Sequence, residues 1–259
     1  MAYSLAGKWI LITGASSGFG AAAAAAFGAL GCQLLLGARR LDRLETVAET
    51  ARRAGSPNAL IHLLDVTKTT SVEEFAQWAR ARASTVDVLI NNAGGAHGLD
   101  PVASGRDEDW EAMLQTNVLG LLRVTRAILP LMPKDAGSSI LNIGSVAGRS
   151  AYEGGAAYCA AKAGELKITE ALRLELNGTG IRIGTIDPGL ARTDFSVVRF
   201  KGDQAKADKV YEGVFPLVAE DVAEAMVWVA TRPPHVNIDE MVIKCVDQAA
   251  IFKVFRRPK

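Results

Sequence analysis

The sequence predicts an α/β fold in which about seven parallel strands form one doubly wound sheet with helices on both faces. Short apolar runs bounded by Gly, Asn or Asp alternate along the chain with longer segments whose apolar residues recur at helical spacing. The short runs are almost continuously apolar, which is typical of parallel strands covered on both faces. Neither a composition shift nor a long polar linker divides the 259 residues, so we expect 1–259 to form a single domain.

The first strand is expected at 9–12, where an apolar run ends at Thr13-Gly14. The apolar stretch 21–38 is long enough to raise the question of a membrane span. Its first half is mostly alanine, glycines interrupt it and two arginines close it, so it indicates a helix, a turn and a strand at 32–36, and no membrane partner. The remaining strands are expected at 60–64, 86–90, 139–143, 181–186 and 240–243, with helices at 41–54, 72–83, 110–131, 158–176 and 221–231.

A doubly wound sheet places its ligand crevice at the carboxyl ends of the strands, which is where we expect the chemistry. The least regular part of the chain is 189–218, between a predicted strand and a predicted helix. An insertion of this length in a compact α/β domain is usually a functional lid, so we predict a substrate-binding lid there.

Composition and cysteine spacing exclude several classes of partner. Lys and Arg number 29 against 28 Asp and Glu, and a net charge of +1 offers no basic excess for binding nucleic acid. Cys32, Cys159 and Cys245 are widely separated, and no Cys or His spacing matches a zinc site, so we expect no metal. Reduced thiols, together with an N-terminal sequence that lacks the order of a signal peptide, predict a cytoplasmic location.

Three glycines follow the first predicted strand and open the alanine-rich helix, as in a Rossmann-type dinucleotide-binding domain. Gly14 permits the tight turn, Gly18 lets the backbone approach a pyrophosphate, and Gly20 lets the helix pack closely. The helix N-terminus then offers free N–H groups and a positive dipole end. We therefore predict a dinucleotide site at this junction.

The end of the second predicted strand favours NADP(H) as the cofactor. An acidic residue at this point binds the ribose 2′-hydroxyl of NAD, whereas a cation accommodates the 2′-phosphate of NADP. The sequence has Arg39 and Arg40 there, and no carboxylate before Asp42. The alternative is that both arginines are merely solvated at a helix start. Asp65, directly after the third strand, either accepts a hydrogen bond from the adenine amino group or caps the next turn.

Further motifs follow in the same order as in a known family, and together they cover nearly the whole chain. The sequence resembles the short-chain dehydrogenase/reductase family in Thr13-Gly-x-x-x-Gly-x-Gly, Asn91-Asn92-Ala93-Gly94, Asn117, Ser145, Tyr158-x-x-x-Lys162 and Pro188-Gly189. The resemblance implies cofactor contacts from Gly14, Ser16, Ser17, Gly18, Phe19, Arg39, Arg40, Asp65, Val66, Asn91, Ala93, Gly94, Tyr158, Lys162, Pro188, Gly189 and Thr193.

The resemblance implies four catalytic residues, and the residues themselves support them. Tyr158 and Lys162 are four positions apart, so on a helix they share a face, where an ammonium favours the phenolate. Tyr158 is therefore the predicted proton donor and acceptor. Ser145 ends a predicted strand on the crevice side and can donate to a developing alkoxide. In similar enzymes the lysine also holds the nicotinamide ribose, and Asn117 stands where they brace a water that relays protons.

Within the family, residues 189–203, followed by Lys206 and Tyr211, and the later 234–238 are similar to NADP-dependent 3-hydroxy acid (serine or allo-threonine) dehydrogenases and to sulfoacetaldehyde reductases. Such substrates are small anions. Arg199 and Lys201 are placed to clamp a carboxylate or sulfonate from the lid, or Arg199 instead makes an ion pair that holds the lid shape. Arg149 is a further candidate for contact with the substrate anion. The alternative is that it is a solvated loop residue.

Two other functions stay open. The same chemistry can serve a neutral ketone, a sugar or a carrier-bound 3-ketoacyl group, for which the basic tail 253–257 is the visible docking candidate. A non-catalytic NADP sensor is the more distant alternative, since such proteins typically lose the tyrosine or the lysine. The apolar side chains of 249–257 have no obvious sheet partner, which together with the family resemblance predicts a homotetramer.

Overall fold

A computed structural model of the chain describes residues 3–134 and 137–258. Seven parallel strands form one sheet in the order β3-β2-β1-β4-β5-β6-β7, so the predicted fold class is confirmed. The predicted strand positions agree with the structure to within about two residues at each end. The strands are β1 (Trp9–Thr13), β2 (Gln33–Ala38), β3 (Ala59–Leu63), β4 (Val88–Asn91), β5 (Ser139–Ile143), β6 (Arg182–Pro188) and β7 (Glu240–Ile243).

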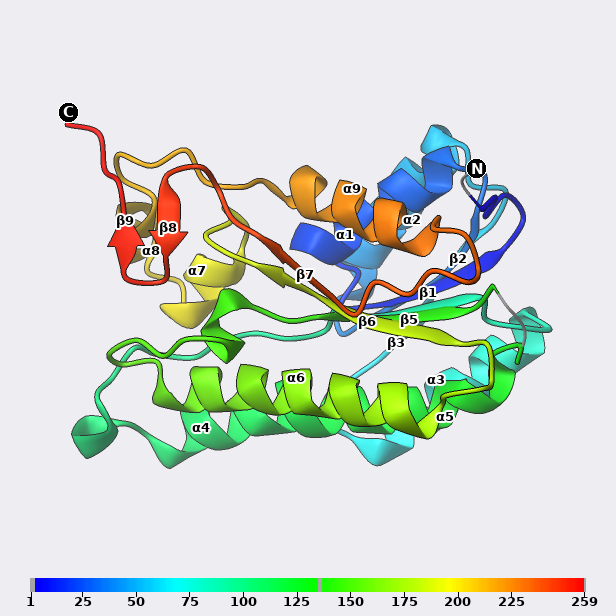
Figure 1. Cartoon of the computed structure of the whole chain (residues 1–259), viewed down its shortest axis with the longest axis horizontal. Coiled ribbons are helices and arrows are strands. Elements are labelled where there is room, and N and C mark those ends of the chain that lie inside the picture. Colours follow the sequence, from blue (N-terminus) through cyan, green and yellow to red (C-terminus); the bar gives the residue numbers. More distant parts are fainter. Residues whose placement is uncertain (1–2, 135–136, 259) are drawn as a thin grey trace.

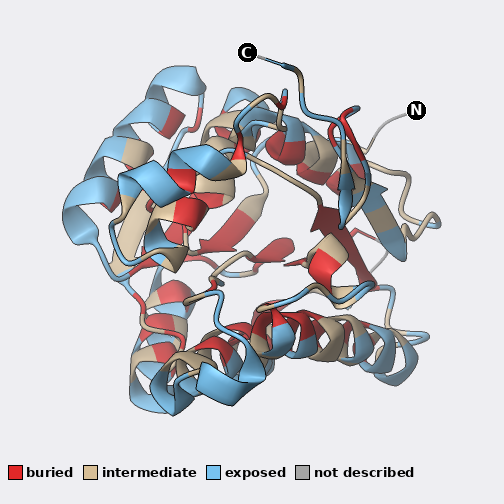
Figure 2. Cartoon of the chain, turned by 90° about the vertical axis from the view of Figure 1, so that its left-hand side faces the viewer, coloured by how far each residue is buried: buried red, intermediate tan, exposed pale blue. Residues whose placement is uncertain are grey.

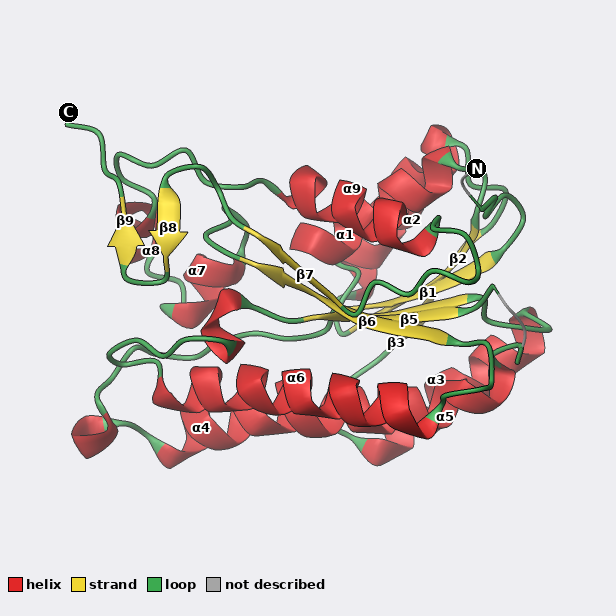
Figure 3. Cartoon of the chain, viewed as in Figure 1, coloured by secondary structure: helices red, strands yellow, loops and turns green. Residues whose placement is uncertain are grey.

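Helices cover both faces of the sheet (Figures 1 and 3). One layer contains α1 (Gly18–Ala29), α2 (Leu41–Ala54) and α9 (Ala219–Ala230). The opposite layer contains α3 (Thr69–Arg82), α4 (Asp107–Leu114), α5 (Gly120–Ile128) and α6 (Ala156–Glu175). This is the doubly wound arrangement expected from strands that are apolar on both sides.

The segment predicted as one helix over 110–131 is divided in the structure. Between α4 and α5 lies a π-helical turn, η2 (Gln115–Leu119), and the segment ends in a 3-10 turn, η3 (Leu129–Leu131). The single-helix prediction was wrong in this detail because Pro130 lacks the N–H of a continuing helix and because hydrophobic spacing does not reveal a π-turn. Two other 3-10 turns, η1 (Val102–Ser104) and η4 (Val146–Gly148), lie in connecting loops.

The sheet separates two apolar cores, one on each face. On β1, Ile10 and Ile12 pack into one cluster with α1, α2 and α9, while Leu11 between them packs into the other with α3 and α5. All three side chains are fully buried. Figure 2 shows the buried residues concentrated along the strands and the inner sides of the helices. Because successive strand residues alternate between the two cores, packing on both faces holds the sheet in place, and with it the carboxyl ends of the strands.

Segment 189–218 contains two short helices, α7 (Phe195–Arg199) and α8 (Gln204–Val210). Next to it lies an antiparallel ribbon of β8 (Gln248–Ala250) and β9 (Lys253–Val254), which the sequence did not predict. Asp247 connects the two parts: it accepts a hydrogen bond from the Phe215 amide at 2.7 Å and pairs with Arg257. The C-terminal residues therefore help to hold the segment that the sequence predicts to be a lid.

Among the described residues, no helix is both long enough and apolar enough to cross a membrane.

Candidate active site

A cleft of about 300 Å³ opens at the carboxyl ends of the central strands. It is bounded on one side by the glycine-rich turn after β1 and on the other by Tyr158 of α6. Most of the predicted cofactor contacts meet here, although they come from the segments after five strands and from helix α6. Those that line it are Gly14, Ser16, Ser17, Phe19, Arg39, Arg40, Asp65, Val66, Ala93, Gly94, Tyr158, Lys162 and Thr193.

The glycines of this turn are required by close approach. Gly14 has φ +63°, and a Cβ there would lie 2.8 Å from the Cα of Ala93. A Cβ on Gly20 would lie 2.6 Å from Nδ2 of Asn92, an amide that donates to the carbonyls of Thr13 and Gly14. The turn and the loop after β4 are therefore pressed together, which leaves the first turn of α1 facing the cleft. No acidic side chain lies in that first turn, so its N–H groups can receive an anion.

Arg40 lies against the same turn. Its guanidinium donates to the hydroxyls of Ser16 and Ser17, with the shorter contact, to Ser17, at 2.8 Å. Arg39 lines the cleft next to it and is exposed. Two cations and two hydroxyls thus surround one end of the cleft, an arrangement suited to a phosphate.

Asp65 lines the cleft and also caps a turn. Its Oδ1 accepts hydrogen bonds from the backbone amide and the hydroxyl of Thr67, at 3.0 and 2.7 Å. Desolvation raises the pKa of this carboxyl, but the Thr67 hydrogen bonds, with Arg39 nearby, outweigh it and hold the pKa below its usual value. Of the two roles expected for Asp65, the structure shows the turn cap. The carboxylate also keeps its charge where it lines the cleft.

The side chain of Asn91, another predicted cofactor contact, does not line the cleft. It is buried between β4 and β5, where its Nδ2 donates to Thr125 and Asn142, both at 2.9 Å. The next residue, Asn92, lines the cleft instead. Strand alternation explains this, because adjacent residues point to opposite sides.

A second cavity of about 240 Å³ adjoins the first and shares Tyr158 with it. Ser145 lines this cavity, and its Oγ accepts a hydrogen bond from the Ala147 amide at 3.1 Å, which fixes the hydroxyl at the start of η4. Tyr158 is only 8% exposed, so it can meet a molecule that enters the cavity while most of its ring is shielded. Predicted residues Pro188, Gly189 and Thr193 line this cavity as well. Gly18 lies outside both linings and faces Thr193.

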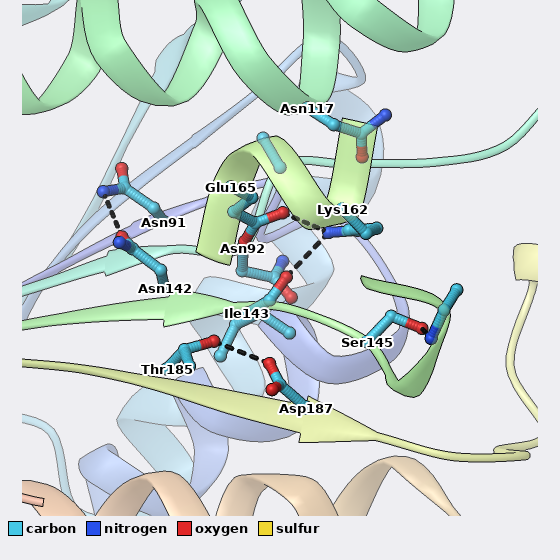
Figure 4. A network of polar contacts seen from close by, with 12 residues as sticks. Asn91, Asn92, Asn117, Asn142, Ile143, Ser145, Lys162, Glu165, Thr185 and Asp187 are labelled. Atoms are coloured by element: carbon cyan, nitrogen blue, oxygen red, sulfur yellow. Dashed lines mark hydrogen bonds and ion pairs between the residues drawn. The ribbon is translucent and has the colours of Figure 1, made fainter. Parts of the chain in front are cut away.

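Lys162 lies at the inner end of the first cleft. Its ammonium donates to the Ile143 carbonyl at 2.8 Å and to Oε2 of Glu165 at 2.7 Å (Figure 4). Desolvation lowers the pKa of Lys162, but the Glu165 carboxylate outweighs it and holds the pKa above its usual value. Burial raises the pKa of Glu165 to about 7 despite the lysine. Glu165 was not predicted as a site residue, although a carboxylate three positions after the lysine is a signal visible in the sequence.

Asn117 lies in the π-turn η2, a distortion that is frequent at functional sites. Its Nδ2 donates to the carbonyls of Gly95 and Met113, at 2.9 and 2.7 Å, and its Oδ1 accepts from the Gly95 amide. A Cβ on Gly94 would lie 2.7 Å from that oxygen and 3.5 Å from the Lys162 ammonium. Asn117 therefore holds the loop after β4 next to the lysine.

Arg199, at the end of α7, projects over the second cavity. Its guanidinium lies 5.0 Å from the ring centroids of both Tyr158 and Phe195 and 5.7 Å from that of Tyr152. One of its N–H groups donates to the Tyr152 hydroxyl at 2.6 Å, and its Nε is buried without a hydrogen-bond partner. Burial raises the pKa of Tyr152 to about 12, although Arg199 opposes this, so that hydroxyl stays neutral. Within the described residues no carboxylate pairs with Arg199.

The other two candidate substrate contacts lie outside both cavities. Arg149 forms ion pairs with Asp187 of β6 at 2.6 Å and with Glu240 of β7 at 2.7 Å, so its guanidinium links these two strands. Arg149 is exposed in the turn after η4, but its guanidinium is bound to two carboxylates and is not placed to meet an anion in the second cavity. Lys201 pairs with Asp109 of α4 at 2.8 Å, so it is this residue, and not Arg199, that makes an ion pair holding the lid segment.

No cluster of three or more His, Cys, Asp or Glu side chains that could bind a metal occurs among the residues that the structure describes.

Comparison with known proteins adds to this geometry. The family described as "short chain dehydrogenase" matches residues 8–204. An NADP-dependent 3-hydroxy acid dehydrogenase of Schizosaccharomyces pombe is 41% identical over 254 residues, 98% of each chain. Sulfoacetaldehyde reductase 2 of Chromohalobacter salexigens is 43% identical over 242 residues, 93% of this chain and 95% of its own. The closed form of serine dehydrogenase complexed with NADP+ superposes with a TM-score of 0.89 at 39% identity, covering 96% of this chain and 100% of that one.

Proposed function

The chain belongs to the short-chain dehydrogenase family, and we propose that it interconverts a small 3-hydroxy acid, or its sulfonate analogue, and the corresponding carbonyl compound with NADP(H). The cofactor supplies or accepts the hydride. The cleft fits this cofactor, because Gly14 lets the turn pack tightly against the loop after β4, the start of α1 offers N–H groups, and Arg40 stands beside two serine hydroxyls. An NADP-dependent relative at 41% identity and a serine dehydrogenase structure with NADP+ at 39% identity support the assignment of this cofactor.

In the proposed mechanism, Tyr158 moves the proton at the reacting oxygen. It gives its hydroxyl proton to the carbonyl oxygen in reduction and takes a proton from the alcohol in oxidation. Ser145 donates a hydrogen bond to the same oxygen as negative charge develops on it. Lys162, on the same face of α6, favours the phenolate electrostatically. The shared position of Tyr158 between the two cavities supports this division of roles.

The choice of an anionic substrate rests on Arg199. Its buried Nε has no partner, its one side-chain hydrogen bond goes to a neutral tyrosine, and aromatic rings surround it. A cation in such surroundings favours a carboxylate or sulfonate that would satisfy its remaining N–H groups. An anion held there would extend toward Tyr158, which places the opposite end of a short substrate at the reacting position.

The first experiment compares substrates in wild-type enzyme and in Arg199→Met. NADPH consumption is measured with malonic semialdehyde, sulfoacetaldehyde and a neutral ketone of similar size, and with NADH alongside. We expect the substitution to raise KM for the two anions by roughly 10–100-fold, the loss of about one charge-assisted hydrogen-bonded contact, and to leave the neutral ketone nearly unchanged. Lys206→Met is the matched control, because it removes an exposed cation of the same segment that lies outside the cavity and pairs with nearby Asp203.

Equal losses for the anions and the neutral ketone would contradict the anion-clamp assignment. Tyr158→Phe tests the catalytic assignment separately and is expected to lower kcat about 10²–10⁴-fold for every substrate. Turnover by Tyr158→Phe at the wild-type rate would contradict the proposed mechanism. Absence of turnover in wild-type enzyme that binds NADPH tightly would favour the sensor function.

We further propose that segment 189–218 acts as the lid and that the protein is a homotetramer. The lid assignment is supported by α7, which brings Phe195 and Arg199 to the substrate cavity. A tetramer with twofold axes needs two different self-complementary surfaces. Exposed apolar side chains on two surfaces support this: the layer of α4, η2, α5 and α6, and the C-terminal ribbon, where Phe252 is 82% exposed. The relevant residues of the helical layer are Leu114, Leu119, Leu122 and Leu174.

A further inference from the structure

Glu165 is a buried acid that the proposed mechanism does not use. It lies on α6 one turn after Lys162, is 2% exposed, and its Oε2 is 2.7 Å from the lysine ammonium. The lysine itself is 7% exposed. A carboxylate in such a position costs free energy unless its charge is compensated, so this placement calls for a reason.

The ammonium of Lys162 has three N–H donors, and two of them are used within the protein. One donates to Glu165 and one to the Ile143 carbonyl, which ends strand β5. The third remains for the cleft side, where Lys162 lines the wall next to Tyr158. Figure 4 shows the carboxylate and the carbonyl holding the ammonium between α6 and β5. The pair therefore fixes both the position and the charge of the lysine.

Few other charges face the pair. Tyr158 lies one turn earlier on α6, and Asp187 faces the pair from β6 with its carboxylate already bridged to Arg149. From η2 and the strands β4 and β5, the neighbouring described side chains are amides, namely Asn117, Asn91 and Asn142. Glu165 is therefore the nearest compensating charge for the lysine.

We propose that Glu165 is a positioning residue whose carboxylate keeps Lys162 protonated and in place, and thereby extends the alkaline range in which Tyr158 can act as a base. The inference rests on the proposed function for its reaction, but not for the identity of the substrate. Full burial disfavours an ammonium strongly and can lower the pKa of a lysine by several units. Without the carboxylate, Lys162 would lose its proton at a pH where the wild-type residue keeps it.

The test compares Glu165→Gln with wild type. Glutamine retains an oxygen that accepts a hydrogen bond but carries no charge. The matched control is Glu170→Gln, which removes an equally spaced carboxylate, the partner of Lys167, from an exposed position of the same helix. The first readout is the pH dependence of kcat/KM for alcohol oxidation. We expect the alkaline limb of Glu165→Gln to move down by about two pH units, and that of Glu170→Gln to stay in place.

The second readout needs neither cofactor nor substrate. Carbon NMR of Cε-labelled lysine, with the Lys162 signal assigned from Lys162→Met, reports the titration of the amine directly. We expect the midpoint of the Lys162 signal to fall in Glu165→Gln by a similar amount. This readout stays informative even if no hydroxy acid is turned over, so a failure of the proposed function is distinguishable from a failure of this inference.

Glu165→Asp covers the case in which Glu165→Gln does not fold. Aspartate keeps the charge, so we expect the alkaline limb of kcat/KM to stay near its wild-type pH. We expect kcat to fall, because the shorter aspartate side chain holds Lys162 less well in place. An unchanged Lys162 midpoint in Glu165→Gln would overturn the proposal. In the absence of a folded glutamine variant, an alkaline limb that moves by two units in Glu165→Asp would overturn it as well.

Discussion

At the scale of single residues, the site depends on where a few charges are held. Arg40 is bound to two serine hydroxyls of the glycine-rich turn, so its guanidinium is already in place before a phosphate arrives. Arg199 is the opposite case, because its hydrogen-bonding capacity is incompletely used. The first cation is thus preorganised by the turn, whereas the second is placed for a ligand.

We propose that Arg40 sets the preference for NADP(H) over NAD(H). Removing its side chain in Arg40→Ala should weaken NADPH binding roughly 10–100-fold, because charge-assisted hydrogen bonds to a phosphate are lost, and should leave NADH binding almost unchanged. Fluorescence titration of both cofactors measures this. Arg53→Ala, on the exposed far end of α2, serves as control. An equal loss for both cofactors would mean that Arg40 only supports the turn.

At the scale of elements, close packing of α1 and the loop after β4 positions the cofactor cleft. This packing depends on Gly20, where the space for a side chain is taken by Asn92 and by the backbone of residues 14–15. The π-turn η2 has a similar role on the other side, where it presents Asn117 to the backbone of Gly94 and Gly95. In both places, two segments of the chain come into close contact next to the end of a strand.

We expect Gly20→Ala to destabilise the protein by about 1–3 kcal/mol, because the added methyl group must displace backbone and the side-chain amide of Asn92. Gly164→Ala on α6 is the matched control. A Cβ at that position meets only Val118, at 3.7 Å, so this substitution should be neutral or stabilise the helix by about 0.5–1 kcal/mol. Urea unfolding followed by circular dichroism measures both. A Gly20→Ala variant as stable as wild type would show that the turn can relax.

At the scale of the whole molecule, one end carries the chemistry. The lid helices α7 and α8 and the C-terminal ribbon lie together at that end (Figure 1). Lys201 ties the lid to α4, and Asp247 ties it to the C-terminal residues. The substrate cavity therefore has walls from the sheet, the lid and the C-terminal segment, so its shape depends on the full chain.

The proposed tetramer gives a mass prediction. Light scattering should report about four times the chain mass of 27.4 kDa. Leu122→Glu combined with Leu174→Glu places two charges on the helical layer and should yield a species of half that size, because one of the two twofold surfaces is lost. Leu30→Glu, at the end of α1 on the opposite layer, should leave the mass unchanged. A monomeric wild-type protein would contradict the proposal.

The sequence by itself determined the features that depend on local spacing. Continuous apolar runs specified buried parallel strands, the glycine pattern specified the turn after β1, and the spacing of Tyr158 and Lys162 specified a shared helix face. In each case the relevant partners lie within a few residues of one another, so periodicity and backbone conformation carry the information. For this reason the fold class and the position of the cofactor cleft were predictable.

Tertiary structure alone decided which charged side chains are compensated and which are free. Arg149, Lys201 and Arg199 look alike in the sequence, yet the first two pair with carboxylates from distant elements and only the third faces the substrate cavity. The burial of Glu165 beside Lys162 likewise depends on β4, η2 and α5, which surround its side chain. The physical reason is that pairing and desolvation are set by neighbours that the fold brings from far along the chain, and local spacing contains no record of them.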